Sequence, residues 1–226
     1  MTTDTPPLAL DIDGTLTDSA GSLDPRVFEY LPVWDAPVVL ATGKAFPYPV
    51  SLCHYLGLDL TVIAENGGVV LADNAVSYQG DRERAQAAAA EFVERGGDLG
   101  WGAFDAVNEW RRTEIAINLS ADEELLRETA AAFDLEVVDT GYAYHLKTPG
   151  VEKGTGLKAV AETLGRDPTE FVAIGDSEND VSTFEVAGRS YAVANADEAA
   201  KNAADVVVGE SYFDGTASIL ESLAST

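Results

Sequence analysis

The amino-acid sequence predicts an α/β fold, in which a Rossmann-like parallel sheet carries a smaller inserted α+β unit. Three observations lead to this prediction. Short apolar runs alternate with helix-like segments near both ends of the chain. In the middle, strand-like segments follow one another through tight turns. Several apolar runs end directly in polar, glycine-containing strings, which is typical of ligand sites at the carboxyl edge of a parallel sheet.

The first block alternates strand, helix and strand, which favours crossover connections and a parallel sheet. Asp24-Pro25 has the pattern of an N-cap with proline in the first helical position, and Gly57 is placed to end the second helix. The expected strands are residues 8–10, 37–40 and 61–64, and the expected helices are residues 24–30 and 47–56.

The middle block predicts antiparallel pairing, because strand-like segments at 135–139 and 142–147 meet around Thr140-Gly141. A helix is expected over 81–95 and a strand over 112–119. Ser120 is expected to cap a helix at 122–133, with Glu123 completing a capping box. We therefore expect a cap domain at residues 79–149 and a core domain made of residues 1–78 and 150–226.

The crossover pattern returns in the last block, where apolar residues at helical spacing predict a helix over 153–164. The remaining expected strands are residues 171–174, 191–194 and 205–208, with an alanine-rich helix before the last strand and a final helix over 215–223.

The charge is extreme, with a net charge of −25 and a pI near 4.1 for 226 residues. It argues against binding to nucleic acid or to anionic membranes. The acidic residues are spread along the chain and lysine is scarce, as in proteins of salt-loving microbes. No apolar run is long enough to span a membrane, and Met1–Pro7 does not look like a signal peptide, so a cytoplasmic protein is expected. Cys53 is expected to be a small buried thiol.

The first candidate site is Asp11 and Asp13, which follow the apolar run 8–10 and precede Gly14-Thr15. Strand alternation predicts that both carboxylates leave the strand on one side. Such close acids repel each other unless a cation lies between them, and short oxygen ligands suit Mg²⁺. In a chain with 39 acidic residues an Asp-x-Asp pair also arises by chance, and a solvated turn is the alternative interpretation.

Phosphate-binding groups follow at two further places. Thr42-Gly43-Lys44 offers a hydroxyl, a backbone N–H and a cation after the second apolar strand. Lys153 begins a predicted helix, where it opposes the helix dipole but helps to bind an anion. A solvated surface lysine is the alternative at Lys153.

The last string, Gly175-Asp176-Ser177-Glu178-Asn179-Asp180, again follows an apolar strand and again offers oxygen ligands for Mg²⁺. The alternative is an acidic turn in an acidic protein. Because the carboxyl ends of parallel strands share one edge of a sheet, the strings at Asp11, Thr42 and Gly175 are expected to converge.

Taken together in this order, the strings resemble the four motifs of the haloacid dehalogenase-like (HAD) phosphatases. The insert between the second and third motifs resembles a type II cap, and Glu65-Asn66-Gly67-Gly68 with Gly150-Val-Glu-Lys-Gly resembles the Cof-like, type IIB branch. The resemblance implies a Mg²⁺-dependent phosphomonoester hydrolase with an aspartyl-phosphate intermediate, in which Asp11 is the nucleophile and Asp13 the general acid/base. It implies metal binding by Asp11, Asp13, Asp176 and Asp180, and substrate binding by Thr42, Gly43, Lys44, Asn66 and Lys153.

The short cap and the acidic composition further resemble archaeal phosphatases acting on phosphoglycolate, so a small phosphorylated metabolite, first of all 2-phosphoglycolate, is the expected substrate. Trp101, Arg111 and Arg112 could reach its carboxylate or lie on the surface, and His145 is expected to be structural or to line the pocket. A sugar-phosphate phosphatase or phosphosugar mutase of the same branch is the first alternative. A non-catalytic HAD-like binding module is the second.

Overall fold

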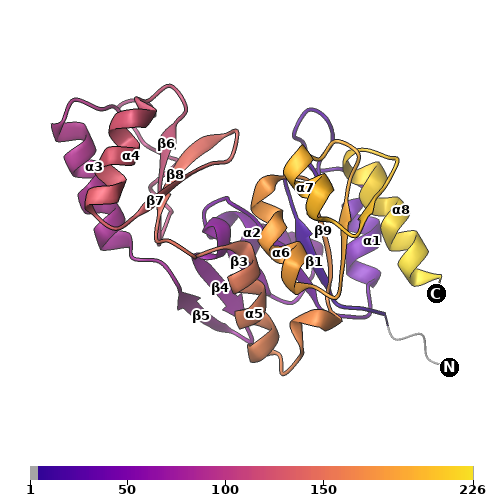
Figure 1. Ribbon diagram of the computed structural model, residues 1–226. Coiled ribbons are helices and arrows are strands. Elements are labelled where there is room, and N and C mark those ends of the chain that lie inside the picture. Colours follow the sequence, from indigo (N-terminus) through magenta and orange to yellow (C-terminus); the bar gives the residue numbers. More distant parts are fainter. Residues whose placement is uncertain (1–4, 226) are drawn as a thin grey trace.

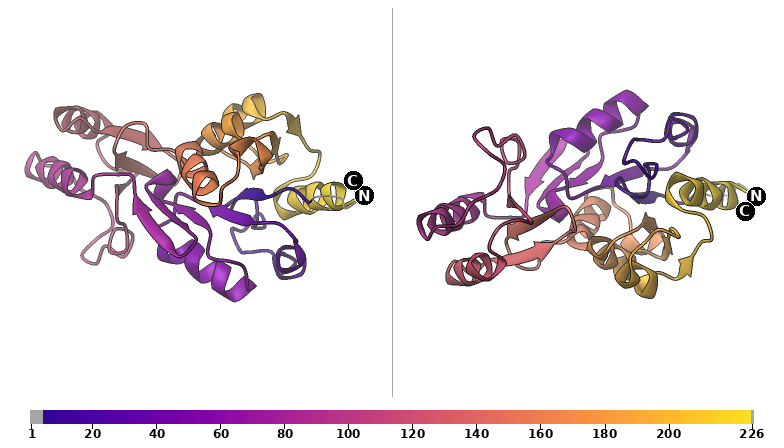
Figure 2. Two further views of the ribbon diagram at one scale, coloured as in Figure 1. Left: turned by 90° about the horizontal axis from the view of Figure 1, so that it is seen from below. Right: turned by 90° about the horizontal axis from the view of Figure 1, so that it is seen from above.

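A computed structural model describes residues 5–225, which form two sheets with helices packed on them (Figure 1). The α/β class and the small antiparallel insert expected from the sequence are both confirmed. The chain passes between the two parts twice, once after strand β5 and once after strand β8, and the final helix α8 lies at the far end from the inserted part (Figure 2). The expectation about Met1–Pro7 falls partly on residues 1–4, outside the described residues.

The larger sheet has eight strands in the order β11-β10-β9-β1-β2-β3-β4-β5. The pairs from β11 to β3 are parallel, whereas β3-β4 and β4-β5 are antiparallel. Its strands are β1 (Leu8–Asp11), β2 (Val38–Ala41), β3 (Val62–Ala64), β4 (Val69–Ala72), β5 (Ala75–Tyr78), β9 (Val172–Gly175), β10 (Arg189–Ala192) and β11 (Val206–Val207).

Helices cover both faces of this sheet, and the alternation within β1 shows how the two layers form. Leu8 and Leu10 pack into the layer under α1, α2 and α8, while Ala9 packs into the layer under α5, α6 and α7. The helices are α1 (Val27–Tyr30), α2 (Pro47–Leu56), α5 (Lys153–Thr163), α6 (Val181–Val186), α7 (Glu198–Ala203) and α8 (Tyr212–Ala224), with short 3-10 turns η1 (Leu31–Val33), η2 (Glu65–Gly67), η3 (Pro168–Glu170) and η4 (Glu178–Asp180). Cys53 is fully buried in the first layer, as expected.

The smaller sheet is antiparallel, in the order β6-β8-β7, with two helices packed on one face. The elements are α3 (Arg82–Glu94), β6 (Ile115–Asn118), α4 (Glu123–Ala132), β7 (Glu136–Asp139) and β8 (Ala143–Lys147). In β8, Tyr144 and Leu146 point to the helices. His145 and Lys147 therefore face the larger sheet, because successive side chains alternate across a strand.

Several element boundaries differ from the sequence-based expectation, and the strand expected at 191–194 is β10 at Arg189–Ala192. The carboxylate of Asp24 accepts from the N–H of Arg26 and closes a turn, so α1 begins only at Val27. Asp122, not Ser120, caps α4 by accepting from the N–H of Leu125. The final helix begins at Tyr212, three residues before the expected start at 215. Strand β6 begins at Ile115 because the N–H groups of Arg112 and Thr113 bind the Glu65 carboxylate instead of a strand.

The hairpin β4-β5 is an element that the sequence analysis did not predict. Asp73 and Asn74 join its strands with φ angles of 47° and 60°, a left-handed turn that favours such short polar residues. All four residues of β5 are exposed, so the strand carries no apolar alternation by which to recognise it.

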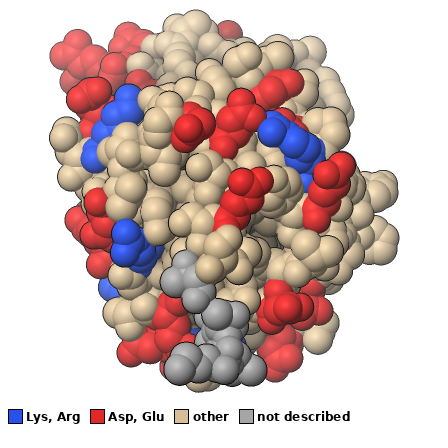
Figure 3. Space-filling model, turned by 90° about the vertical axis from the view of Figure 1, so that its right-hand side faces the viewer, with Lys and Arg blue, Asp and Glu red and all other residues tan. Residues whose placement is uncertain are grey.

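The surface matches the acidic composition. Acidic side chains are scattered over the face shown in Figure 3, with only a few basic ones between them. Over residues 5–225, no helix has both the length and the apolar character needed to cross a membrane.

Candidate active site

The polar strings that follow β1, β2 and β9 meet at one edge of the larger sheet. β1 lies between β2 and β9, with Asp11 in register with Ala41 and Leu10 with Ile174. Since these strands are parallel, the residues that follow them leave the sheet on the same side.

Three carboxylates gather at this edge. One carboxylate oxygen each from Asp11, Asp176 and Asp180 lies within 4.8 Å of the other two. Asp11 and Asp180 are 6% and 3% exposed, respectively. Lys153, at the first turn of α5, is 1% exposed and donates from Nζ to Oδ1 of Asp11 at 2.6 Å and to Oδ1 of Asp180 at 2.7 Å.

The charges in this cluster do not balance. Burial raises the pKa of Asp11 above its usual range, although the charge of Lys153 opposes the shift. Burial and the neighbouring carboxylates of Asp11 and Asp180 raise the pKa of Asp176. The same two aspartates raise the pKa of Lys153 against the effect of its burial. One ammonium group is thus shared among three acids, and the cluster has room in its charge balance for a further cation.

Asp180 and Gly175 shape the loop after β9. Oδ2 of Asp180 accepts from the N–H groups of Asp176 and Ser177 at 3.0 and 3.1 Å. A Cβ on Gly175 would come within 2.4 Å of the Asp180 carboxyl group. Both oxygens of Asp180 are therefore engaged, and its geometry supports the loop and Lys153.

Gly14 allows the two halves of the site to approach each other. Its φ is +82°, and a Cβ there would lie 2.0 Å from Oδ2 of Asp176. The nearby hydroxyl of Thr15, which the sequence analysis did not single out, lies 3.5 Å from Oδ1 of Asp176. Only glycine at position 14 fits both this backbone angle and this contact.

Asp13 and Lys44 lie at the mouth of the site. Their side chains are 50% and 43% exposed, and Lys44 Nζ is 2.5 Å from Oδ2 of Asp13. Thr42 is 1% exposed, and its hydroxyl oxygen accepts from the N–H of Lys44 at 3.1 Å. Asp13 and Lys44 therefore face the solvent side, while Thr42 supports the loop that carries Gly43 and Lys44.

A second buried polar cluster, which we call the cap cluster, consists of Arg111, Glu114 and His145 from the smaller unit. Nη1 of Arg111 donates to Glu114 Oε1, and Nδ1 of His145 lies 2.7 Å from the same oxygen. Burial alone would raise the pKa of Glu114, but His145 and Arg111 together hold it down at about 2.

The cap cluster touches the larger unit at two points. Nη1 of Arg111 donates to the carbonyl oxygen of Gly43 at 3.0 Å. Nδ2 of Asn66 lies 3.4 Å from Glu114 and 3.3 Å from His145. Asn66 thus contacts the cap cluster through its Nδ2, while its Oδ1 accepts from Asn179 of the loop after β9 at 3.2 Å.

Glu114 was not predicted as a site residue, and the sequence left open whether Arg111 reaches the substrate carboxylate or lies on the surface, because an arginine before a strand gives no signal of burial. At 3% exposed, Arg111 does not lie on the surface, which was one of its two expected positions. The alternation of His145 and Lys147 with apolar residues in β8 is the signal that could have indicated a polar face turned toward the core.

Glu65 fastens the start of the smaller sheet to the larger one. Its carboxylate accepts from the N–H groups of Arg112 and Thr113 and, at 2.7 Å, from the hydroxyl of Thr113. Burial and the nearby Glu114 raise the pKa of Glu65. A buried carboxylate therefore joins the end of β3 to the segment that leads into β6.

A cavity of about 430 Å³ joins the aspartate cluster to the cap cluster. Tyr48 of the larger unit and Tyr142 of the smaller one, 54% and 64% exposed, lie along it. Its lining also includes Asp11, Asp13, Gly14, Gly43, Lys44, Arg111, His145 and Asp176.

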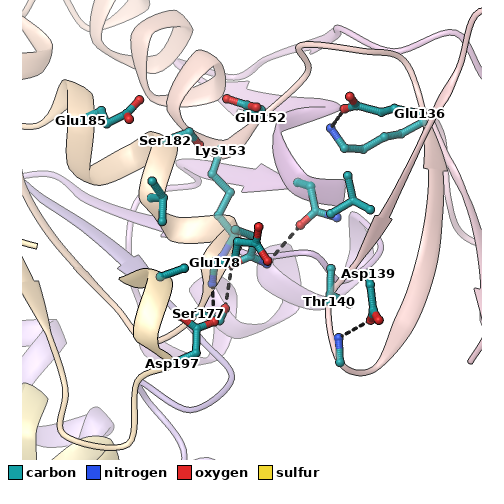
Figure 4. A pocket seen from close by; sticks show the side chains of 17 residues that line it. Glu136, Asp139, Thr140, Glu152, Lys153, Ser177, Glu178, Ser182, Glu185 and Asp197 are labelled. Carbon is teal, nitrogen blue, oxygen red and sulfur yellow. Dashed lines mark hydrogen bonds and ion pairs between the residues drawn. The ribbon is translucent and has the colours of Figure 1, made fainter. Parts of the chain in front are cut away.

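A larger neighbouring cavity of about 740 Å³ lies between the face of β7 and β8 and the loop after β9, and its walls carry many acids (Figure 4). Lys153 and Asn66 line this cavity, but Asp11 and Asp13 do not. The smaller cavity holds the carboxylates that could react with a substrate, and we take it as the candidate active site.

The donor set of the aspartate cluster fits a hard divalent cation. Carboxylate oxygens are the ligands that Mg²⁺ prefers, and the excess of negative charge around Lys153 favours a bound cation. The structure therefore supports a metal site at Asp11 and Asp176, with Asp180 beside it.

Comparison with known proteins agrees with the fold. The haloacid dehalogenase-like hydrolase family matches residues 8–95 and 109–220. The chain belongs to this family of hydrolases, as the resemblance in its motifs predicted.

Its relatives point to one activity. A phosphoglycolate phosphatase of Halorubrum lacusprofundi is 68% identical over 96% of this chain and 97% of its own length. A phosphoglycolate phosphatase of Natronomonas pharaonis is 56% identical over 92% of this chain and 93% of its own length. The crystal structure of Thermoplasma acidophilum 0175 has 25% identity and a TM-score of 0.84, covering 98% of this chain and 99% of its own.

Proposed function

We propose that this protein is a Mg²⁺-dependent phosphomonoester hydrolase that converts 2-phosphoglycolate and water to glycolate and phosphate. The observation that carries the proposal is the convergence of Asp11, Asp176 and Asp180 around buried Lys153, beside a small cavity. The names of the haloarchaeal relatives support the choice of substrate.

The proposed division of the chain follows the two sheets. Residues 1–78 and 150–226 form the core domain, which carries the reacting carboxylates, and residues 79–149 form the cap domain. The crossing points after β5 and β8 support these boundaries.

In the first half-reaction, a carboxylate oxygen of Asp11 attacks phosphorus and the bond to the substrate's ester oxygen breaks. Asp13 gives its proton to that oxygen, so glycolate leaves as an alcohol. Asp13 must therefore enter this step protonated, with the proton that it took up from water in the previous turnover, and in that form it leaves its ion pair with Lys44, which frees Lys44 for the substrate.

In the second half-reaction, water attacks the phosphorus of the aspartyl-phosphate, and Asp13 takes up the proton of the water. The bond between phosphorus and Asp11 breaks, and phosphate leaves. Lys153 already holds Asp11 at 2.6 Å, so the nucleophile is oriented before substrate arrives.

We assign the metal to Asp11, Asp176, Asp180 and the backbone carbonyl of Asp13, with Asp180 acting mainly through the loop that it supports. A bound Mg²⁺ supplies positive charge that offsets the repulsion between an anionic nucleophile and a phosphate ester. We assign phosphate binding to Thr42, Gly43, Lys44 and Lys153, and contact with the rest of the substrate to Asn66.

The expected partner is a small phosphorylated metabolite, and the expected location of the protein is the cytoplasm. The net charge of −25 speaks against nucleic acid or an anionic membrane as a partner.

The test is a panel of phosphate esters, assayed for released phosphate in concentrated KCl with Mg²⁺. We expect kcat/KM for 2-phosphoglycolate to exceed that for ethyl phosphate by about tenfold or more, since one charge-assisted contact to the carboxylate has that effect. A preference for a hexose phosphate would keep the hydrolase chemistry and reject the substrate. Conversion of one sugar phosphate into another would indicate a mutase, and no turnover of any ester would indicate a binding module.

A further inference from the structure

We propose that Arg111 is the residue that binds the carboxylate of the substrate, and that Glu114 and His145 hold it in position. The inference rests on the proposed function and names the part of the cap cluster that recognises the substrate. Arg111 lines the same cavity as Asp11 and Lys44, yet only 3% of it is exposed.

The guanidinium group of Arg111 has hydrogen-bond acceptors at Nη1 but, within the described part of the chain, none at Nε. Nη1 is engaged by the Gly43 carbonyl and by Glu114. Nε is fully buried, and no acceptor among residues 5–225 lies within hydrogen-bonding distance of it. A buried N–H without an acceptor costs free energy, and a bound anion would remove that cost.

The surroundings keep Arg111 from turning away. Glu114, itself 1% exposed, is shared by Arg111, His145 and Asn66. Because Glu114 does not line the cavity, its role is to orient Arg111 and His145 rather than to touch a substrate.

Position and chemistry favour a carboxylate over the phosphate. The phosphorus must lie against Asp11 on the core side, whereas Arg111 comes from the cap side and contacts the phosphate loop only through the backbone of Gly43. The planar guanidinium matches the two oxygens of a carboxylate. Lys44, the other permanent cation in the cavity lining, lies beside Asp13 and is assigned to the phosphate.

The test compares 2-phosphoglycolate with ethyl phosphate in wild type, Arg111→Lys and Arg111→Met. We expect both variants to bring the ratio of the two kcat/KM values down to within about threefold of one, mainly through a higher KM for phosphoglycolate. Lysine keeps the charge but lacks the planar group. Arg112→Lys is the matched control, because that neighbour's side chain is exposed and does not line the cavity, and it should keep the wild-type ratio.

The outcomes separate the two proposals. If wild type prefers phosphoglycolate and the folded Arg111 variants keep that preference, the role of Arg111 is wrong and the proposed function stands. If wild type shows no preference for phosphoglycolate, the proposed substrate and the role of Arg111 both fail.

If the variants do not fold, the test is made on the wild-type protein. Addition of glycolate should shift the Nε–H resonance of Arg111 in ¹H–¹⁵N spectra, while ethylene glycol should not. An unchanged resonance at saturating glycolate would overturn the inference.

Discussion

The two buried clusters beside the cavity have opposite charge balances. In the core, Asp11, Asp176 and Asp180 share one lysine, and the pKa values of Asp11 and Asp176 are raised. In the cap, one carboxylate, Glu114, faces Arg111 and His145, and its pKa is lowered. The difference teaches that the core edge is built to take up a cation, whereas the cap carboxylate is already paired and serves to hold Arg111 beside the cavity.

The most severe change to the core cluster is Asp11→Asn. Because a neutral amide cannot attack phosphorus, activity should fall below about one hundredth of wild type with the fold retained. Released phosphate and circular dichroism measure the two properties. Asp73→Asn, an exposed aspartate in the turn between β4 and β5, is the control and should keep full activity. A folded Asp11→Asn protein with substantial turnover would rule out the covalent route.

Asp176→Asn tests whether the core cluster lacks positive charge. In the presence of a chelator, the free energy of unfolding of the variant should be higher than that of wild type by about 1 kcal/mol or more. One pKa unit of unfavourable shift corresponds to about 1.4 kcal/mol. Added Mg²⁺ should stabilise wild type and restore its activity, but should do little for the variant. Urea titrations with and without Mg²⁺ measure this. Equal responses of both proteins to the metal would contradict the assignment of Asp176.

Glu114→Gln tests the opposite balance in the cap. A carboxyl group with a lowered pKa stabilises the fold above its unfolded pKa and loses that contribution as pH falls. With an unfolded value of 4.5 and a folded value of about 2, the window lies between about pH 5 and pH 2. The stability advantage of wild type over the variant should shrink by about 2 kcal/mol between pH 6 and pH 3.

The control for this profile is Glu124→Gln, at an exposed position of the first turn of α4. Its difference from wild type should stay nearly constant over the same pH range. If the free energy of unfolding of Glu114→Gln also differed from that of wild type by a constant amount over this pH range, Glu114 would not be the paired carboxylate of the cap cluster.

The smallest expected stability effect is at Lys44, between the two clusters. Its ion pair with Asp13 is about half exposed, so Lys44→Gln should change the free energy of unfolding by less than about 1 kcal/mol. The KM for phosphate esters should rise nonetheless, because Lys44 is assigned to the substrate. A large loss of stability would mean that the pair is structural.

The core site could be predicted from the sequence because each of its parts is local. An apolar strand followed directly by Asp11, by Thr42 or by Gly175 specifies both the element and the edge at which it ends. The order of parallel strands in the sheet is then enough to predict that these strings lie together, and no side-chain contact has to be known.

The cap cluster could not be predicted in this way. Asn66, Arg111, Glu114 and His145 come from four separate segments, and only the packing of the two sheets brings them together. The β4-β5 hairpin was missed for a related reason: its edge strand is exposed on both faces and lacks the periodic pattern that marks a strand.

The attachment at Glu65 has a consequence for how the cap can move. Swinging the cap away would strip a buried carboxylate of the N–H groups of Arg112 and Thr113 and of the Thr113 hydroxyl, and each hydrogen bond to a charged group contributes about 1.5–3 kcal/mol. A motion of the cap that keeps Arg112 and Thr113 on Glu65 therefore costs less than one that parts them, so this attachment point acts as the fixed end of the cap.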